Sequence, residues 1–346
     1  MRGSVVDLFC GAGGLTHGLK AEGFAIAAGI DVDEECRYAF EYNNKAPFVR
    51  MDVSALDPAE LESYFYKDHP RILVGCAPCQ PFSTYNQKSD DPKWRLVGKF
   101  ADIICSSLPD VVSMENVPRL RDFQRGQTFK SFIQKLERAG YSVSHDVVFL
   151  PEFGIPQTRS RLVLLASLHG QIELPESTVS EEQFKTVSQT IGMLPPIKAG
   201  ETHEKDILHQ ASRLADINLK RIRSSVPGGS WKDWKPELVA DCHKAEQGLT
   251  YRSVYGRMRA DRPAPTITTQ FFGFGNGRFG HPEQDRGLSL REGALLQTFP
   301  PNYAFTRPGE IVKFKHVGRM IGNAVPVDLG RAIGRAIKVH VRKAGL

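Results

Sequence analysis

Two cysteines three residues apart raise the question of what chemistry this chain performs. Cys76 and Cys79 lie in "GCAPCQPFS" (75–83), and the remaining cysteines, at 10, 36, 105 and 242, are scattered singly. A zinc pair would need two further ligands at a suitable spacing, and no His cluster lies nearby in the sequence. The spacing fits a redox pair, but such a pair is expected to open a helix directly, whereas "QPFS" brings a second proline.

The two cysteines differ in their surroundings. Cys76 ends an apolar run and is interpreted as a buried small residue, since free cysteine is commonly buried. Cys79 follows Pro78 in a turn with polar neighbours, where a thiol can reach a ligand. Glu115, in "MENV" (114–117), ends the next apolar run. A thiol that adds to an aromatic ring needs an acid on the same ring to absorb charge, and Cys79 with Glu115 supplies this combination.

The elements that must position these residues alternate between strand and helix patterns. A mostly parallel sheet with helices on both sides is predicted, and ligands of such sheets bind at the carboxyl ends of the strands. From residue 286 a helical pattern returns, and the chain closes with a long amphipathic helix after a Gly-Asn turn. The β-rich apolar runs predict strands at 4–9, 24–31, 71–76, 110–117, 142–150 and 161–167.

The first strand leads into a glycine turn, "DLFCGAGGLTHGL" (7–19), in which Gly11 and Gly13 let the backbone approach a ligand closely. The dinucleotide fingerprint would place a small residue at position 16, and this chain has Thr16, which disfavours a nicotinamide dehydrogenase. Asp31 ends the next strand, where a carboxylate can accept hydrogen bonds from ribose hydroxyls.

A second segment could complete the same pocket. In "RMDVSAL", Asp52 and Val53 stand where the edge and face of an adenine could rest. With the glycine turn and Asp31, they predict a site for a nucleoside cofactor without phosphates.

Composition bounds the class of protein. The 346 residues suit two domains or one large domain with an insertion, and no apolar run reaches the ~18 residues that a transmembrane helix needs. The N-terminus is not expected to be a signal peptide, and the irregular cysteines favour a reducing cytoplasm. Residues 1–70 hold 6 Lys/Arg against 12 Asp/Glu within a chain of net charge +6, so the rest is basic and suits a polyanionic partner.

The chain resembles the DNA (cytosine-5)-methyltransferase family. The resemblance implies an α/β fold, with a Rossmann-like S-adenosylmethionine-dependent methyltransferase domain and a smaller target-recognition domain inserted before the C-terminal motifs. It implies a catalytic and cofactor-binding domain at 1–167, the target-recognition domain at 168–285, and a segment at 286–346 that returns to the catalytic domain. The matching motifs follow the family's order: "DLFCGAGGL", "GIDVDEEC", "MDV", "GCAPCQPFS", "ENV", "QTRSR", "RGLSLREGALLQTFP" and "GNAVPV".

By this resemblance, the Cys79 thiolate adds to C6 of a cytosine, C5 takes the methyl group, and loss of the C5 proton with elimination of Cys79 releases the product. Glu115 is expected to hydrogen-bond N3 and the exocyclic amine. Arg161 and Arg159, in "QTRSR", are expected to hold the base carbonyl and a phosphate, to which the fork of an arginine is suited. The resemblance assigns the cofactor S-adenosyl-L-methionine to Phe9, Gly11, Gly13, Asp31, Val32, Asp52, Val53, Asn323 and Val325.

The implied partner is double-stranded DNA, from which the target base must be flipped at a cost of a few kcal/mol. The loop 84–98 is expected to close over that base. "KRIRSSVPGGSWKDWK" (220–235) is dense in Lys and Arg, so Lys220, Arg221 and Arg223 are candidate phosphate contacts. The alternative interpretation of Trp231 and Trp234 is that they are core residues of a small domain. No membrane association and no metal ion are expected. We expect a monomer in the cytoplasm that is associated with the bacterial nucleoid when it is bound to DNA.

Two alternatives stay open. The same chemistry could act on tRNA, although the long 168–285 region favours duplex DNA. A catalytically dead DNA-binding regulator could keep the fold, but it would be free to lose the Cys79–Glu115 pair, which this chain has. The sequence predicts either the modification enzyme of a restriction-modification system or an orphan methylase, and basic residues do not reveal which bases are read.

Overall fold

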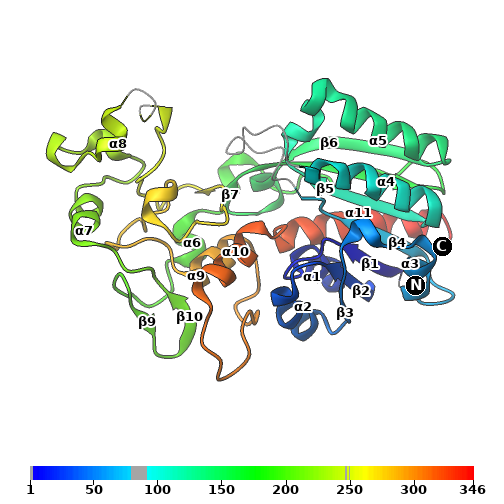
Figure 1. The fold of residues 1–346 in the computed structure, drawn as a ribbon, viewed down its shortest axis with the longest axis horizontal. Coiled ribbons are helices and arrows are strands. Elements are labelled where there is room, and N and C mark those ends of the chain that lie inside the picture. Colours follow the sequence, from blue (N-terminus) through cyan, green and yellow to red (C-terminus); the bar gives the residue numbers. More distant parts are fainter. Residues whose placement is uncertain (1–2, 79–91, 246–247, 249) are drawn as a thin grey trace. The chain divides into compact units, whose positions relative to one another are not determined.

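A computed structural model describes residues 3–78, 92–245, 248 and 250–346, and the chain divides into two units (Figure 1). The first unit takes its residues from 1–153, 160–178 and 324–346, and the second from 154–159 and 179–323. Residues 286–323 therefore group with the second unit, and 324–346 with the first. The functional division at 167 and 285 stays a prediction.

A seven-stranded sheet forms the centre of the first unit. Five adjacent strands run parallel to one another, and β8 runs antiparallel to the strands on either side of it, β5 and β6. The predicted α/β class with a largely parallel sheet is therefore confirmed. The order across the sheet is β3 (Phe48–Arg50), β2 (Ala25–Asp31), β1 (Ser4–Leu8), β4 (Arg71–Gly75), β5 (Val111–Asn116), β8 (Ser160–Ser167) and β6 (Ser142–Phe149).

Six of these strands match the predicted apolar runs to within about one residue at each end. The short β3 was not predicted, because three residues carry too little pattern. Strand order turns between β1 and β4, since β2 and β3 lie on one side and β5 on the other. Such a turning point opens a crevice at the carboxyl ends of the strands. The segment after β1 carries the predicted glycine turn, and the segment after β4 carries the motif with Cys79.

Helices cover both faces of this sheet. On β1, Val6 and Leu8 pack into the core beneath α3, α4 and α5, whereas Asp7 points to the opposite face and hydrogen-bonds Thr16 of α1. Figure 1 shows the corresponding grouping, with α4 and α5 on one side and α1 and α2 on the other. The helices of this unit are α1 (Gly14–Ala21), α2 (Arg37–Asn44), α3 (Pro58–Tyr64), α4 (Arg95–Ser107), α5 (Gln127–Arg138) and α11 (Val327–Lys343).

Small residues let α11 cross α1 at close range. A Cβ atom on Gly18 would lie 2.4 Å from the carbonyl oxygen of Val327, and one on Gly330 would lie 2.7 Å from that of Leu15. Glu22, which follows α1, accepts contacts at 3.2 Å from Arg331 and also from Arg335 of α11. This crossing fastens the end of the chain to the sheet that carries the glycine turn.

Two predicted boundaries were wrong. The predicted loop 84–98 is helical in its last part, because a short 3₁₀ turn, Pro92–Trp94, leads into α4; residues 84–91 lie outside the described part. The Gly-Asn pair at 322–323 is not a turn but the last two residues of α10 (Phe314–Asn323). The helix ends there because Pro326 disfavours helical backbone at Val325 and cannot donate a hydrogen bond.

The second unit has short elements around small apolar clusters. Trp231 and Trp234 are 6% exposed and pack with Ile222 and Phe274, so both tryptophans are core residues. Arg286 and Glu292 form a fully buried ion pair at 2.7 Å. The elements are β7 (Gln157–Thr158), α6 (Val187–Ile191), β9 (Thr202–His203), β10 (Asp206–Gln210), α7 (Asp216–Arg223), α8 (Asp241–Lys244), β11 (Ala264–Pro265), α9 (Leu290–Leu296) and α10.

The described part of the chain lacks both a membrane-spanning helix and a metal-binding cluster. None of the helices in that part is long and apolar enough to cross a membrane. Nor do three or more His, Cys, Asp or Glu side chains gather there in a way that could hold a metal ion.

Candidate active site

Three side chains from neighbouring strands meet at the carboxyl end of β5. Glu115 is 2% exposed, and its Oε1 lies 2.7 Å from Nε of Arg161, at the start of β8. Its other oxygen, Oε2, accepts a hydrogen bond of 2.8 Å from the thiol of Cys76, which follows β4. The sheet register explains the meeting: Gly75 pairs with Met114, so the next residues of these parallel strands are Cys76 and Glu115.

The same register places Arg161. Glu115 faces Val163 across the antiparallel β5–β8 pair, and Arg161 lies two residues before Val163 on the same face of β8. Its guanidinium also donates 2.9 Å to the carbonyl oxygen of Ser160. The structure thus brings together Glu115 and Arg161, which the sequence predicted as site residues.

The interpretation of Cys76 as a buried small apolar residue was wrong. Cys76 is half-buried, and its thiol is a hydrogen-bond donor to Glu115. Sequence reasoning missed this contact because 39 residues separate the two side chains, and only the strand order makes them neighbours. The proposed nucleophile, Cys79, lies outside the described residues.

Arg159 belongs to the second unit, although only two positions separate it from Arg161. It is 7% exposed, and its Nη1 donates 3.3 Å to the carbonyl oxygen of Ile267. Its buried Nε has no hydrogen-bond partner among the described residues. A buried guanidinium N–H without an acceptor in the protein can still donate a hydrogen bond to a ligand.

The glycine turn after β1 is held in left-handed backbone conformations. Gly11 and Gly13 have φ angles of 50° and 86°, and the bulky Phe9 has a φ of 61°. For a phenylalanine this is an outlier of the kind that collects at ligand sites. Built onto Gly11, a Cβ would meet nothing within 4 Å, so the backbone there faces open space.

Asp31, at the end of β2, closes this turn. Its Oδ2 accepts a hydrogen bond of 2.9 Å from the Gly11 N–H, and its Oδ1 accepts one of 2.9 Å from the Asp33 N–H. Burial raises the pKa of the Asp31 carboxyl, and these N–H donors act against that shift. A ligand that brings further donors or positive charge to Asp31 would offset the cost of burying its carboxylate. The ribose hydroxyls of a nucleoside are such donors.

A second buried carboxyl lies below the turn. Burial raises the pKa of Asp7 to about 7; the hydrogen bond from Thr16 lowers it, and the charge of Asp31 raises it further. A carboxyl with this pKa is only partly ionised at neutral pH, so Asp7 gives this end of the sheet a partial negative charge beside that of Asp31. A cofactor with a positive sulfonium suits such a field.

The other predicted cofactor residues differ in exposure. Val32 is 62% exposed beside Asp31, which leaves its side chain open for a flat ring. Asp52 is exposed, and its Oδ1 accepts 2.8 Å from the Ser54 N–H. Val53 and Val325 are 2% and 6% exposed, so their side chains offer little surface to a ligand. The remaining predicted residue, Asn323, is exposed at the end of α10 and belongs to the second unit.

Replacing Asp31 with alanine or asparagine is expected to weaken S-adenosylmethionine binding by about 1.5–3 kcal/mol, the range for a lost hydrogen bond to a charged group. Calorimetric titration measures this effect. The control is Asp57→Ala, which removes a carboxylate that only caps α3 by accepting 2.8 Å from the Ala59 N–H. DNA affinity without cofactor should barely change, and unchanged cofactor affinity in both Asp31 variants would show that the ribose is misplaced.

The basic segment of the second unit contains cations of two kinds. Arg221 is internal: its Nε donates 2.8 Å to the Leu238 carbonyl, and its guanidinium lies 5.6 Å from the ring centres of Trp234 and Tyr255. Lys220 is exposed in the last turn of α7, and Arg223 makes an exposed ion pair of 3.4 Å with Asp285. The first kind stabilises the unit, whereas the second is available to a polyanion.

A further arginine was missed by sequence reasoning. Arg278, in the glycine-rich "FFGFGNGRFG", is half-buried, and among the described residues its buried Nε has no hydrogen-bond partner. A Cβ on Gly256 would lie 2.6 Å from the Arg278 side chain, so this glycine leaves room for the arginine stem. The nearest signal in the sequence was the density of glycines around a single cation.

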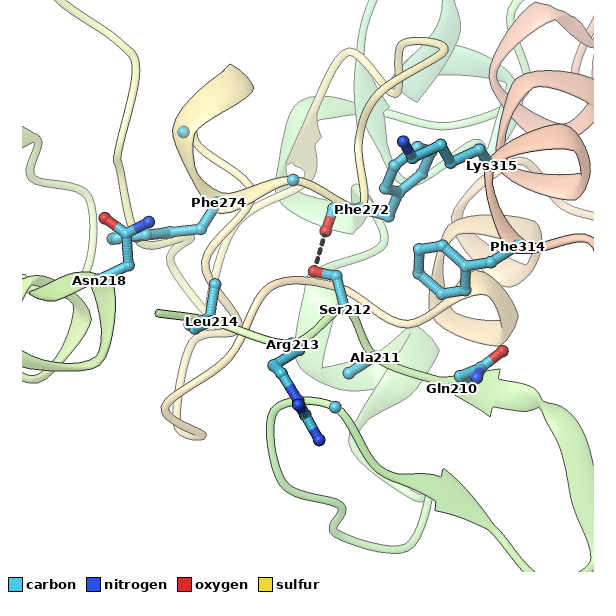
Figure 2. Close-up of a pocket in the computed structure, with 13 residues that line it drawn as sticks. Gln210, Ala211, Ser212, Arg213, Leu214, Asn218, Phe272, Phe274, Phe314 and Lys315 are labelled. Carbon is cyan, nitrogen blue, oxygen red and sulfur yellow. Dashed lines mark hydrogen bonds between the residues drawn. The ribbon is translucent and has the colours of Figure 1, made fainter. Parts of the chain in front are cut away.

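An open cavity of about 530 Å³ also lies in the second unit (Figure 2). Phe272 and Phe314 meet edge to face across it, with ring centres 5.1 Å apart, and Ser212 donates 2.8 Å to the Phe272 carbonyl. The charged ends of Arg213 and Lys315 point to opposite sides of the cavity in Figure 2. The two cations therefore do not form a converging anion site.

Comparison with known proteins gives consistent results. A family model described as C-5 cytosine-specific DNA methylase matches residues 3–339. The Type II methylase M.HgiDII of Herpetosiphon aurantiacus is 56% identical over 339 residues, covering 98% of this chain and 96% of that protein. The Type II methyltransferase M1.HphI of Haemophilus parahaemolyticus is 29% identical, covering 96% and 86%.

Solved structures agree at the level of the fold. The crystal structure of a prophage-encoded E. coli protein described as a DNA modification methyltransferase superposes with a TM-score of 0.77 at 21% identity. The superposition covers 99% of this chain and all of that one. The whole chain, including both units, thus shares its fold with that structure.

Proposed function

Because the chain belongs to the C-5 cytosine-specific DNA methylase family, we propose that it methylates C5 of a flipped-out cytosine in a specific duplex sequence, through a covalent bond between Cys79 and C6. The observation that carries the proposal is the buried Glu115, held between Cys76 and Arg161 at the end of β5. The strand beside it, β4, leads directly into the segment with Cys79. The Type II relatives suggest the modification enzyme of a restriction-modification system.

Three residues of the chain have separate roles in the proposed reaction. C5 of cytosine is a poor nucleophile until the Cys79 thiolate adds at C6 and pushes electrons toward N3. Glu115, in its protonated form, donates a hydrogen bond to N3, and its other oxygen accepts one from the exocyclic amine. Transfer of the Glu115 proton to N3 during the addition neutralises the negative charge that develops there. Arg161 balances the charge of Glu115 and holds the base carbonyl. After methyl transfer, the C5 proton is lost to water, Cys79 leaves C6 as a thiolate, and N3 returns its proton to Glu115, which restores the aromatic ring.

The glycine turn and Asp31 are the proposed cofactor site. S-adenosyl-L-methionine, when bound, supplies an electrophilic methyl group on a sulfonium. Asp31 takes the ribose hydroxyls, Val32 packs on the adenine, and Asp52 borders its edge. The open space beside Gly11 and the left-handed Phe9 support this assignment.

The distribution of charge supports DNA binding by the second unit. Its residues include 22 Lys/Arg against 15 Asp/Glu, whereas those of the first unit include 23 against 24. A basic unit attached to a nearly neutral one is the pattern expected of a protein that holds a polyanion through one part. We assign the phosphate contacts to exposed cations such as Lys220 and Arg223, and add Arg278 as a further DNA contact.

Bisulfite sequencing of DNA from cells that express the chain tests the proposal. It should reveal 5-methylcytosine at one short duplex sequence, which would also identify the target site. The same cells provide the tRNA arm, since bisulfite conversion of their RNA would detect methylation there. Methylation of tRNA alone, or of neither nucleic acid, would contradict the proposed function.

Neutralising exposed cations of the second unit is expected to weaken binding to cognate and unrelated duplexes alike. In the variant Lys220→Gln/Arg223→Gln, each lost phosphate contact should lower the slope of log affinity against log salt by about 0.9. Duplex affinities at several salt concentrations measure this. The control with the same charge change is Lys130→Gln/Arg138→Gln, two exposed cations on α5 of the first unit.

Single substitutions separate the other arginines. Arg221→Gln should lower the melting temperature, because Arg221 packs on Trp234 and Tyr255. Arg278→Gln should weaken DNA binding without that loss of stability. If it weakens the cognate duplex selectively, Arg278 contacts a base; if it weakens all duplexes, it contacts a phosphate. Unchanged affinity for both duplexes would remove Arg278 from the interface.

A further inference from the structure

We propose that Cys76 is a positioning residue of the methyl-transfer reaction: its thiol holds the Glu115 carboxylate in the orientation that the substrate base requires. The inference rests on the proposed role of Glu115. Cys76 itself does not touch the reacting atoms in this scheme. It acts through the hydrogen bond of 2.8 Å that its Sγ donates to Oε2 of Glu115.

The backbone around Cys76 fixes the position of the thiol. The Cys76 N–H donates 3.4 Å to the carbonyl oxygen of Leu8 at the end of β1. The carbonyl oxygen of the next residue, Ala77, accepts 3.1 Å from the side chain of Asn116 on β5. Ala77 and Asn116 are both fully buried. The segment that leaves β4 is therefore tied to the strands on both sides, and the thiol has little freedom to move away from Glu115.

The contact between Glu115 and Arg161 does not by itself fix the orientation of the Glu115 carboxylate. Oε1 lies 2.7 Å from Nε of Arg161, but the geometry is not that of a hydrogen bond, and this buried oxygen has no hydrogen-bond partner among the described residues. A single ionic contact does not prevent the carboxylate from rotating about its terminal bond. The hydrogen bond from the Cys76 thiol to Oε2 is a second contact that restricts this rotation. It leaves an acceptor position on Oε1 for a donor such as the exocyclic amine.

Without the thiol, a competing arrangement becomes available. Arginine and carboxylate groups readily pair through two parallel hydrogen bonds, and such a fork would occupy both oxygens of Glu115. The carboxylate would then have to leave Arg161 before it could accept from the base. The thiol thus favours the arrangement in which Glu115 is paired with Arg161 and still open to the substrate.

The test compares Cys76→Ala, Cys76→Ser and Cys105→Ala in single-turnover methyl transfer from labelled S-adenosylmethionine to unmethylated DNA. Cys105 is the control, a thiol on α4 whose contact is the Lys135 carbonyl oxygen at 3.5 Å. Cys76→Ala should be about tenfold slower, with unchanged dissociation constants for DNA and cofactor. Cys76→Ser should keep most of the rate, because a hydroxyl also donates to a carboxylate. Cys105→Ala should match the wild type.

Glu115→Gln, measured alongside, separates this inference from the proposed function. If Glu115→Gln is inactive and Cys76→Ala transfers at the wild-type rate, the positioning role of Cys76 fails alone. If Glu115→Gln retains its rate, the role proposed for Glu115 fails first. Equal slowing of Cys76→Ala and Cys76→Ser, with a lower melting temperature in both, would mean that Cys76 only packs, and would overturn the inference as well.

Discussion

Replacing Cys79 with alanine is expected to abolish methyl transfer to DNA while S-adenosylmethionine binding survives. The thiol is proposed to act on the base, and without a nucleophile at C6 the C5 carbon does not become reactive. The proposed cofactor residues, such as Asp31 and Gly11, belong to the segments after β2 and β1, so removing the Cys79 thiol leaves them unchanged. Tritium transfer measures the first effect and calorimetric titration the second.

The contrast between the two cysteines is the control for this prediction. Cys76→Ala is expected to slow transfer by about tenfold, whereas Cys79→Ala should leave no transfer above background. Near-normal transfer by Cys79→Ala would refute covalent catalysis by this residue. Complete loss in both variants would instead return the two thiols to a joint role, as their spacing allows.

Replacing Glu115 with glutamine is expected to lower the single-turnover rate by about 10²- to 10⁴-fold, the contribution typical of an acid or base group in the transition state. Glutamine has nearly the shape of glutamate but cannot carry its charge or exchange its proton. Affinities for DNA and cofactor should change much less than the rate. A rate within a few-fold of the wild type would rule out the proposed role of Glu115.

The same substitution should also lower stability. Arg161 is 8% exposed and loses its charged partner at 2.7 Å, and a buried cation without its counter-charge is costly. Thermal unfolding should therefore show a lower melting temperature for Glu115→Gln. The control is Asp146→Asn, which removes one partner of the exposed ion pair between Arg121 and Asp146 at 3.7 Å. Because exposed pairs contribute little, its melting temperature should stay near that of the wild type.

Much of the first unit could be predicted from the sequence, because the relevant signals are local. Strands of such a sheet are short apolar runs, and the six predicted runs all matched strands in the sheet. The glycine turn after β1 was recognisable because a close approach of backbone to ligand needs residues such as Gly11 and Gly13, whose φ angles are positive. The motifs with Cys79 and Glu115 could be placed at strand ends because each directly follows or ends an apolar run.

Element boundaries and the roles of single cations were less predictable. The end of the helix Phe314–Asn323 was predicted as a turn because Gly322 and Asn323 are common turn residues. The glycine instead allows close packing, since a Cβ on Gly322 would lie 2.3 Å from the Thr268 carbonyl oxygen. Arg221 and Lys220 look alike in the sequence, yet only Arg221 packs on aromatic rings. Such differences depend on contacts with residues far along the chain.

The sequence by itself determined the family, the alternation of strands and helices, and the residue types available at the strand ends. Only the tertiary structure decided which of these side chains meet. Cys76 and Glu115 are 39 residues apart, and they touch because β4 and β5 are neighbours in register. Arg161 joins them because β8 runs antiparallel beside β5. The physical reason is that hydrophobic periodicity encodes each element separately, whereas strand order and register, which create the hydrogen bonds of the site, arise only when the elements pack together.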